Sequence, residues 1–145
     1  MVDLKRQAEL RDAIEGMFFS YRAFTERPDR ILERRGLGRV HHRILYFVGR
    51  HPGLSIKRLL DLLKVSKQAL NAPLRQLIEM HLLVVSANAE DRRIRNLQLT
   101  EDGQHLEAEL TGAQMRHLEA ALAHASPAAE AGWREVMAAL IHPEA

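Results

Sequence analysis

The segment from residue 55 to residue 99 changes its hydrophobic period partway along its length. Up to about Met80, apolar residues recur every three or four positions, as they do in amphipathic helices. From Leu82 onward, β-branched and aliphatic residues gather and then alternate with polar ones, which is typical of strands. A chain that switches period in this way has to pack helices and a small sheet around one apolar core.

The helical part of this segment divides into two short helices. Ser55 and Ser66 are good N-cap residues, and leucines follow each of them at helical spacing. Two helices joined by about three residues are the layout of a helix-turn-helix. We expect the second helix to run to about Met80 and to be kinked at Pro73, since proline lacks the N–H that bonds to the preceding turn. Lys64 and His81 stand where glycine is commonly found, in the turn and after the second helix.

The strand-like part predicts a β-hairpin. Leu82–Ala87 and Arg95–Leu99 form its two strands, and a polar turn over residues 88–93 joins them. Thr100 is placed to cap the next helix, where acidic residues suit the positive end of the helix dipole.

Further helices flank this unit on both sides. They are predicted at about residues 4–25, 38–49, 101–124 and 127–141, with Arg27-Pro28 ending the first of them. The fold class is therefore mainly α with a small β-hairpin wing. We expect one domain over residues 1–145, with the winged helix-turn-helix at about 38–100 and helical segments at about 4–25 and 101–142.

Composition narrows the classes of function. Cysteine is absent, which excludes disulfides, thiolate zinc sites and thiol nucleophiles. No stretch reaches the roughly 18 apolar residues of a membrane span. Charged residues soon follow Met1, so no signal segment is expected and the protein is expected to be cytoplasmic. Residues 101–145 carry two basic and eight acidic side chains, whereas the rest of the chain is basic, which favours a polyanion-facing body or simply solvated faces.

A polar helix followed by a basic hairpin suits duplex DNA. A helix fits the major groove, where glutamine and asparagine can bond adenine, and arginine is favoured in narrow minor grooves. Asp91 would repel phosphate, so we expect it to orient a neighbouring arginine instead. The expected DNA contacts are Ser66, Lys67, Gln68, Asn71, Arg75, Asp91, Arg92, Arg93 and Arg95. Ordinary solvated surfaces are the alternative interpretation.

The hairpin and the first residues of the next helix also resemble a known family. Residues 91–100 fit the pattern D-x-R-x-x-x-x-x-L-T, and Gly103 continues it. This is similar to the wing signature of the MarR (multiple antibiotic resistance regulator) family of winged-helix repressors. The resemblance implies a homodimer built from the first, fifth and sixth helices, which binds a pseudo-palindromic operator. It gives Asp91 and Arg93 the wing roles, and Lys67, Gln68 and Asn71 the groove-facing roles.

The same resemblance implies a small aromatic effector that binds between the dimerisation layer and the DNA-binding lobe and releases the repressor from DNA. The residues expected to line that crevice are Phe18, Tyr21, Arg22, His41, His42 and Leu45. Simple packing between the two parts would use the same residues, and both interpretations stay open.

Other chemistry finds little support in the sequence. Neighbouring helical residues point about 100° apart, so His41 and His42 cannot easily share a metal, and no zinc-like spacing occurs. Phosphate-loop, dinucleotide and nucleophile-elbow motifs are absent, so we expect neither an enzyme nor a cofactor. The alternatives to a DNA-binding regulator are a winged-helix protein-interaction module and a small-molecule or metal sensor that does not bind DNA.

Overall fold

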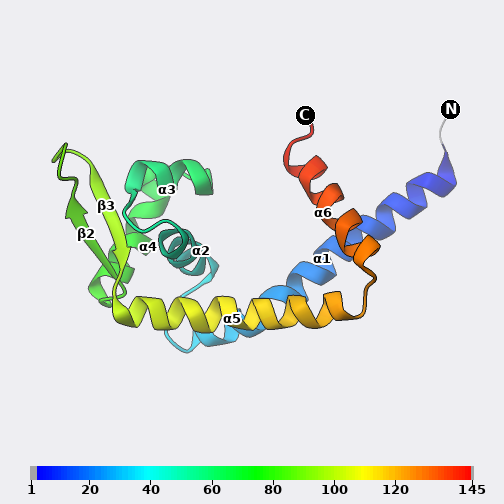
Figure 1. The fold of residues 1–145 in the computed structure, drawn as a ribbon, viewed down its shortest axis with the longest axis horizontal. Helices are drawn as coiled ribbons and strands as arrows, with labels where there is room; N and C mark the ends of the chain where they lie inside the picture. Colours follow the sequence, from blue (N-terminus) through cyan, green and yellow to red (C-terminus); the bar gives the residue numbers. More distant parts are fainter. Residues whose placement is uncertain (1–2, 145) are drawn as a thin grey trace.

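The computed structural model describes residues 3–144. The elements in chain order are α1 (Leu4–Glu33), α2 (Arg39–Arg50), β1 (Leu54–Ser55), α3 (Ile56–Leu63), α4 (Lys67–Glu79), β2 (Leu83–Ala87), β3 (Arg95–Leu99), α5 (Glu101–Ala123) and α6 (Pro127–Ile141). Figure 1 shows α2, α3, α4 and the sheet gathered at one end of the molecule, while α1, α5 and α6 reach toward the other end, where both termini lie.

Four helices begin at a serine or threonine cap, and three of these caps were predicted, Ser55, Ser66 and Thr100. In each case the cap's hydroxyl oxygen accepts a hydrogen bond from the backbone N–H three residues later, at 3.0–3.1 Å. The caps are Ser55, Ser66, Thr100 and Ser126. The predicted helix-turn-helix is confirmed as α3 and α4, which the left-handed residue Lys64 (φ 52°, ψ 46°) separates.

The predicted hairpin is confirmed, and a short third strand joins it. The antiparallel sheet has the order β1-β3-β2, with Val85 opposite Leu97 and Leu54 on the other side of Leu97. A two-residue strand has no periodicity of its own, so β1 could not be recognised from the sequence pattern. It fastens the hairpin to the start of α3.

One apolar core holds this end of the molecule together. Buried leucines from all its helices and strands meet there, including Leu59, Leu77, Leu82 and Leu97, each fully or almost fully buried. Leu32 at the end of α1 and Leu106 and Leu110 near the start of α5 belong to the same core. We call this unit the lobe: α2, α3, α4, the sheet, the last turns of α1 and the first turns of α5.

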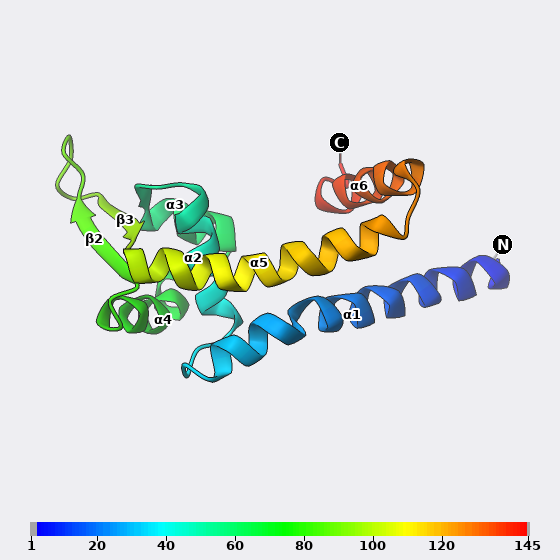
Figure 2. The ribbon, with the colours of Figure 1, turned by 60° about the horizontal axis from the view of Figure 1, so that its bottom comes forward.

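The prediction that Arg27-Pro28 ends the first helix is wrong. α1 runs through Pro28 to Glu33, and Figure 2 shows it as one continuous helix. An interior proline costs about 3 kcal/mol. Here Pro28 and Leu32 are both buried against the lobe, and burial of a leucine side chain is worth about 1.5–3 kcal/mol. Burial of Pro28 adds to this gain, so packing offsets the local cost of the proline.

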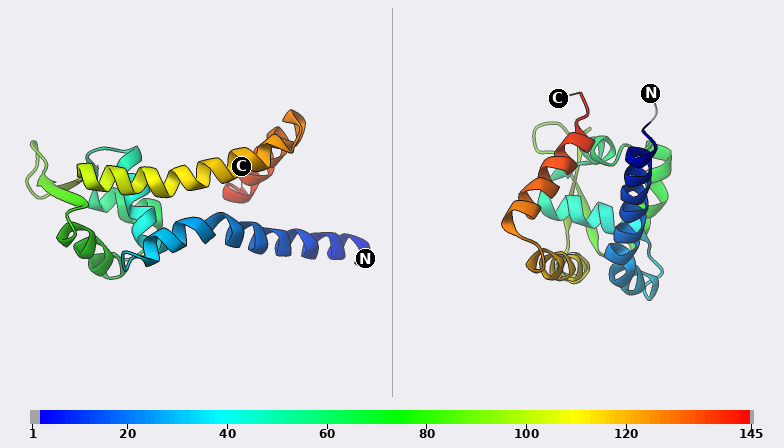
Figure 3. Two further views of the ribbon diagram at one scale, coloured as in Figure 1. Left: turned by 90° about the horizontal axis from the view of Figure 1, so that it is seen from below. Right: turned by 90° about the vertical axis from the view of Figure 1, so that its right-hand side faces the viewer.

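The remaining helical surface is apolar and uncovered. Residues 3–23 are all exposed and α6 has no buried residue. The large apolar side chains exposed there and on α5 are Leu4, Leu10, Ile14, Met17, Phe18, Phe19, Tyr21, Met115, Trp133, Val136, Leu140 and Ile141. We call residues 3–23, the second half of α5, and α6 the arms; Figure 3 shows them extending away from the lobe. Within residues 3–144, no helix combines the length and apolarity that a membrane crossing requires.

Candidate nucleic-acid interface

The second helix of the helix-turn-helix has one buried and one exposed face. Leu70, Leu74 and Leu77 point into the core of the lobe. The exposed face carries the polar side chains that the sequence singled out, Ser66, Lys67, Gln68, Asn71 and Arg75. Pro73 lies within α4, which remains a single helix from Lys67 to Glu79. All five residues are therefore open to solvent, and Lys67, Asn71 and Arg75 follow one another at four-residue steps along α4.

At the tip of the hairpin, one acidic side chain organises an arginine. The Asp91 carboxylate accepts hydrogen bonds from the Arg93 backbone N–H at 3.0 Å and from Arg93 Nε and Nη2 at 3.1 Å each. The side-chain hydrogen bond from Arg93 holds the pKa of Asp91 below its usual value. The Arg93 side chain nevertheless stays 92% exposed. The expected orienting contact is present, and it leaves the guanidinium facing solvent.

The turn itself uses a residue that the sequence reasoning missed. Asn88 Oδ1 accepts hydrogen bonds from the backbone N–H groups of Glu90 and Asp91, at 2.9 and 3.2 Å. An asparagine that bonds the backbone two residues on is a common turn signal and could have been recognised. Arg92 and Arg95 are exposed on either side of Arg93. The hairpin tip is therefore a basic surface on a defined turn.

The end of the wing signature has a structural role. Thr100 Oγ1 caps α5 by accepting from Gly103 N–H, and it donates to the His81 carbonyl at 2.6 Å. His81 is left-handed (φ 60°), as expected from a position that favours glycine. A Cβ on Gly103 would come within 3.0 Å of the Leu82 carbonyl carbon and closer still to its oxygen. Threonine and glycine thus attach the start of α5 directly to the start of β2.

A crevice of about 370 Å³ lies between α1, α2 and α5. Its lining is Tyr21, Phe24, Thr25, Pro28, Asp29, Arg39, His42, Arg43, Tyr46, Phe47, Thr111, Gln114, Met115 and Leu118. Of the six predicted lining residues, only Tyr21 and His42 are among them.

The other four predicted lining residues lie elsewhere, because the register of the helices turns them away. Phe18 and Arg22 are exposed on α1, and Leu45 is fully buried in the core. His41 is also buried and contacts α4 rather than the crevice.

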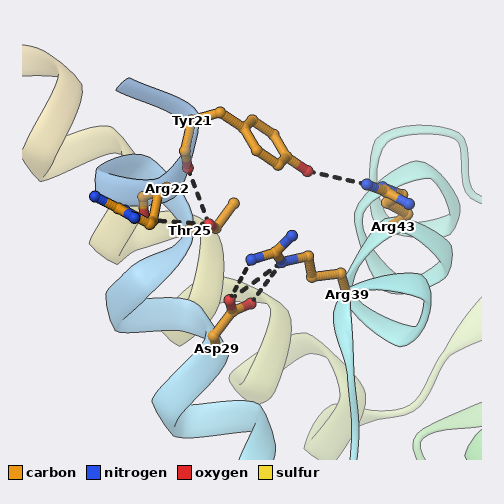
Figure 4. Close-up of polar contacts among 6 residues, drawn as sticks. All are labelled: Tyr21, Arg22, Thr25, Asp29, Arg39 and Arg43. Carbon is orange, nitrogen blue, oxygen red and sulfur yellow. Dashed lines mark hydrogen bonds and ion pairs between the residues drawn. The ribbon is translucent and has the colours of Figure 1, made fainter. Parts of the chain in front are cut away.

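Polar contacts cross one side of the crevice between α1 and α2. Arg39 donates to both carboxylate oxygens of Asp29, with Nη2–Oδ2 at 2.8 Å, and Arg43 Nη2 donates to Tyr21 Oη at 2.9 Å. Figure 4 shows these side chains pointing toward one another from the two helices. The hydrogen bonds to Asp29 raise the pKa of Arg39. Thr25 Oγ1 bonds the Tyr21 carbonyl within α1.

His42 lies on the α5 side of the same crevice. It is 9% exposed, and its Nε2 is 3.2 Å from Thr111 Oγ1, which in turn bonds Glu107. Burial lowers the pKa of His42. His41 and His42 thus have separate partners, and among residues 3–144 no three potential metal-ligand side chains come together.

Comparisons with known proteins match both the sequence and the fold. The model of the MarR family matches residues 35–94. The HTH-type transcriptional regulator PetP of Rhodobacter capsulatus is 47% identical over 135 residues, which cover 93% of this chain and 81% of that protein.

Solved structures share the fold at lower identity. A MarR family transcription regulator superposes with a TM-score of 0.80 at 20% identity, over 95% of this chain and 91% of its own. A SlyA-like regulator from Listeria monocytogenes gives 0.73 at 17% identity, over 99% and 89%. The predicted fold class is confirmed.

Proposed function

Because the chain belongs to the MarR family of DNA-binding transcription regulators, we propose that it acts as a homodimer that inserts α4 and the β2–β3 hairpin into adjacent grooves of one duplex. The observation that carries this proposal is the arginine at the hairpin tip, which Asp91 holds while its guanidinium remains exposed.

The hairpin is suited to a minor groove. The Arg93 side chain is held by two hydrogen bonds to Asp91, so less side-chain freedom is lost when it binds. Its positive charge is directed to solvent at the tip, between Arg92 and Arg95. Narrow minor grooves concentrate negative potential and attract such arginines.

The exposed face of α4 is suited to the major groove. Gln68 and Asn71 can each form paired hydrogen bonds with adenine, and Lys67 can reach guanine or phosphate. Arg75 lies further along the same exposed face, where a phosphate contact is expected. α4 and the hairpin both lie at the end of the molecule away from the termini, as Figures 1 and 2 show.

The arms support a homodimer. Their apolar side chains exceed what a soluble monomer normally exposes. Two-fold pairing of the arms would cover them and would hold two α4 helices on the same side of the assembly. Two identical DNA-binding surfaces related by a two-fold axis then require a pseudo-palindromic site.

The crevice supports control by a small aromatic effector, with repression in its absence. Its volume of about 370 Å³ falls in the range of small-molecule sites, which is roughly 300–1,000 Å³. It lies between α1, which continues into an arm, and α2 of the lobe, so an occupant that favours one relative placement of these helices would shift the spacing of the α4 helices.

The test is duplex binding by the full chain. Duplexes are first selected from a random pool, and Arg93→Ala is then compared with the native protein. We expect Arg93→Ala to weaken binding about 5- to 100-fold. The control Arg30→Ala, at an exposed arginine near the end of α1 that pairs with Glu26, should leave binding nearly unchanged.

Salt dependence distinguishes the main alternative. Native affinity for DNA should fall steeply between about 50 and 200 mM salt. A protein whose Arg93→Ala variant binds as tightly as the native chain would contradict the wing assignment. Failure to select any duplex would favour a protein-interaction module.

A further inference from the structure

The first turn of α2 contacts two elements that lie far apart in the sequence. Arg39 reaches back to Asp29 of α1 through paired hydrogen bonds. His41, two residues later, reaches α4, where its Nε2 lies 2.9 Å from Gln76 Oε1. The same helical turn therefore holds the arm-forming helix on one side and the proposed recognition helix on the other.

The hydrogen bonds around His41 fit one tautomer of its ring. The Gly38 backbone N–H can only donate, so His41 Nδ1, 2.9 Å away, must accept. The proton of the neutral ring then sits on Nε2, which donates to Gln76 Oε1. His41 is 8% exposed, so water competes little for these bonds. The ring is fixed at both nitrogens.

Gln76 is fixed at both ends as well. Its Nε2 donates to the Gly36 carbonyl at 3.2 Å, which obliges Oε1 to face His41. Gly36 lies in the turn that connects α1 to α2 and has a left-handed backbone (φ 70°). One amide on α4 thus ties α4 to α2 and to the turn that ends α1.

These contacts form an unbroken connection from the last turns of α1 to α4. The connection runs from Asp29 on α1 to Arg39 on α2, and from His41 on α2 to Gln76 on α4. Gln76 adjoins Arg75 in sequence, but its side chain points toward α2 and not toward solvent. It can therefore brace α4 against α2 through its hydrogen bonds with His41 and Gly36.

We propose that His41 and Gln76 are positioning residues that set the placement of α4 relative to α1, whose first part forms an arm, and through it the half-site spacing that the dimer accepts. This inference rests on the proposed function, since spacing has meaning only for a dimer on DNA. Neither side chain is required to touch DNA. Loss of the brace lets α4 shift relative to α1, which matters when two α4 helices must fit one duplex together and matters little for one helix on one half-site.

The experiment uses a duplex that the native protein selects from a random pool. Three related probes are made from it: the same duplex with one base pair inserted at its centre, one with a base pair removed, and a single half-site. Affinities are measured for the native chain, for Gln76→Leu, for His41→Leu and for the double variant, together with their melting temperatures. Gln104→Leu, an exposed glutamine on α5, is the matched control.

We expect Gln76→Leu to weaken binding to the native-spaced duplex about tenfold while the half-site affinity changes less than about threefold. The preference for native spacing over the two altered duplexes should shrink by a similar factor. The double variant should bind the native-spaced duplex as tightly as the single variant with the lower affinity, because both substitutions remove the same contact between His41 and Gln76. Gln104→Leu should match the native chain. Should His41→Leu fail to fold, Gln76→Leu alone carries the test, because its side chain is half-buried.

Two results overturn the inference while leaving the proposed function intact. In one, Gln76→Leu keeps the native spacing preference. In the other, it weakens half-site and full duplex equally, which would mean that Gln76 acts on DNA directly or only on stability. A native chain that selects no duplex overturns the proposed function itself, and the inference with it.

Discussion

The lobe and the arms of this molecule contrast in how they are stabilised. The lobe buries its own apolar side chains, with Ile44, Leu59, Leu77 and Leu97 fully removed from solvent. The arms have helices as regular as those of the lobe, yet residues 3–23 are all exposed and α6 buries nothing. Most helical stability in proteins comes from packing an apolar face rather than from helix propensity. The lobe is therefore complete within one chain, whereas the arms need another surface to cover them.

A charge placed on an arm gives the largest expected effect. Phe18 is 70% exposed in the single chain, and Phe18→Glu would place two carboxylates in the interface of the proposed two-fold dimer. We expect the dimer to be weakened by at least about 3 kcal/mol, or more than a hundredfold, because burial of each phenylalanine is worth about 1.5–3 kcal/mol. Sedimentation measures the effect on assembly, and circular dichroism should show that the lobe keeps its helices.

The control for this prediction adds the same charge to the lobe. Gln104→Glu, at an exposed position near the start of α5, should leave the sedimentation behaviour unchanged. A Phe18→Glu protein that assembles like the native chain would remove the contrast between lobe and arms.

A methyl group added at a glycine tests the close packing of the lobe. Alanine is favoured over glycine in a helix by about 1 kcal/mol. At Gly103, however, its Cβ would meet the backbone of Leu82, which cannot move without disturbing the sheet. We expect Gly103→Ala to lower the free energy of unfolding by about 3 kcal/mol, as overpacking of a rigid core does. Denaturant melting measures this loss.

Gly132→Ala, on α6, is the matched control, because nothing lies within 4 Å of its added Cβ. It should be neutral or raise stability by up to about 1 kcal/mol. Equal loss of stability in the two variants would mean that close packing does not distinguish the lobe from the arms.

Features of the lobe that depend on near neighbours were predictable from sequence. The serine caps bond to the N–H three residues later, and Asp91 bonds Arg93 two residues on. Both partners of each hydrogen bond therefore lie within three residues of one another, so residue types and their spacing are enough to predict the bond. The left-handed backbone at Lys64 and His81 was predictable as well, because both residues stand where a turn or a helix end commonly has glycine.

Features set by distant contacts were not predictable in this way. The passage of α1 through Pro28 depends on burial against elements later in the chain, and the contact of His41 with Gln76 spans 35 residues. The crevice shows the same limit. Arg22, His41 and Leu45 adjoin true lining residues in sequence, and Phe18 lies three positions from Tyr21. Small differences in helix rotation nevertheless turn these four side chains to solvent or into the interior.

The smallest expected effect is a pH dependence of stability that arises at the junction of lobe and arms, where α1, α2 and α5 meet. His42 is buried among α1, α2 and α5, and burial lowers its pKa below the ordinary value of 6.5, against an opposing influence of Asp29. As pH falls below 6.5, the His42 imidazole therefore binds a proton in the unfolded chain before it does so in the folded chain. The resulting stability is present above pH 6.5 and is lost as pH falls through the lower, folded-state pKa.

Replacement of His42 by an amide separates this proton from the other effects of acid. We expect the melting temperature of the native chain to fall more steeply from pH 7 to about pH 5 than that of His42→Gln, whose amide can still donate to Thr111. His105→Gln, at an exposed position on α5, should keep the native slope. Parallel curves for all three proteins would mean that proton binding at this junction plays no part in how the lobe is attached to the arms.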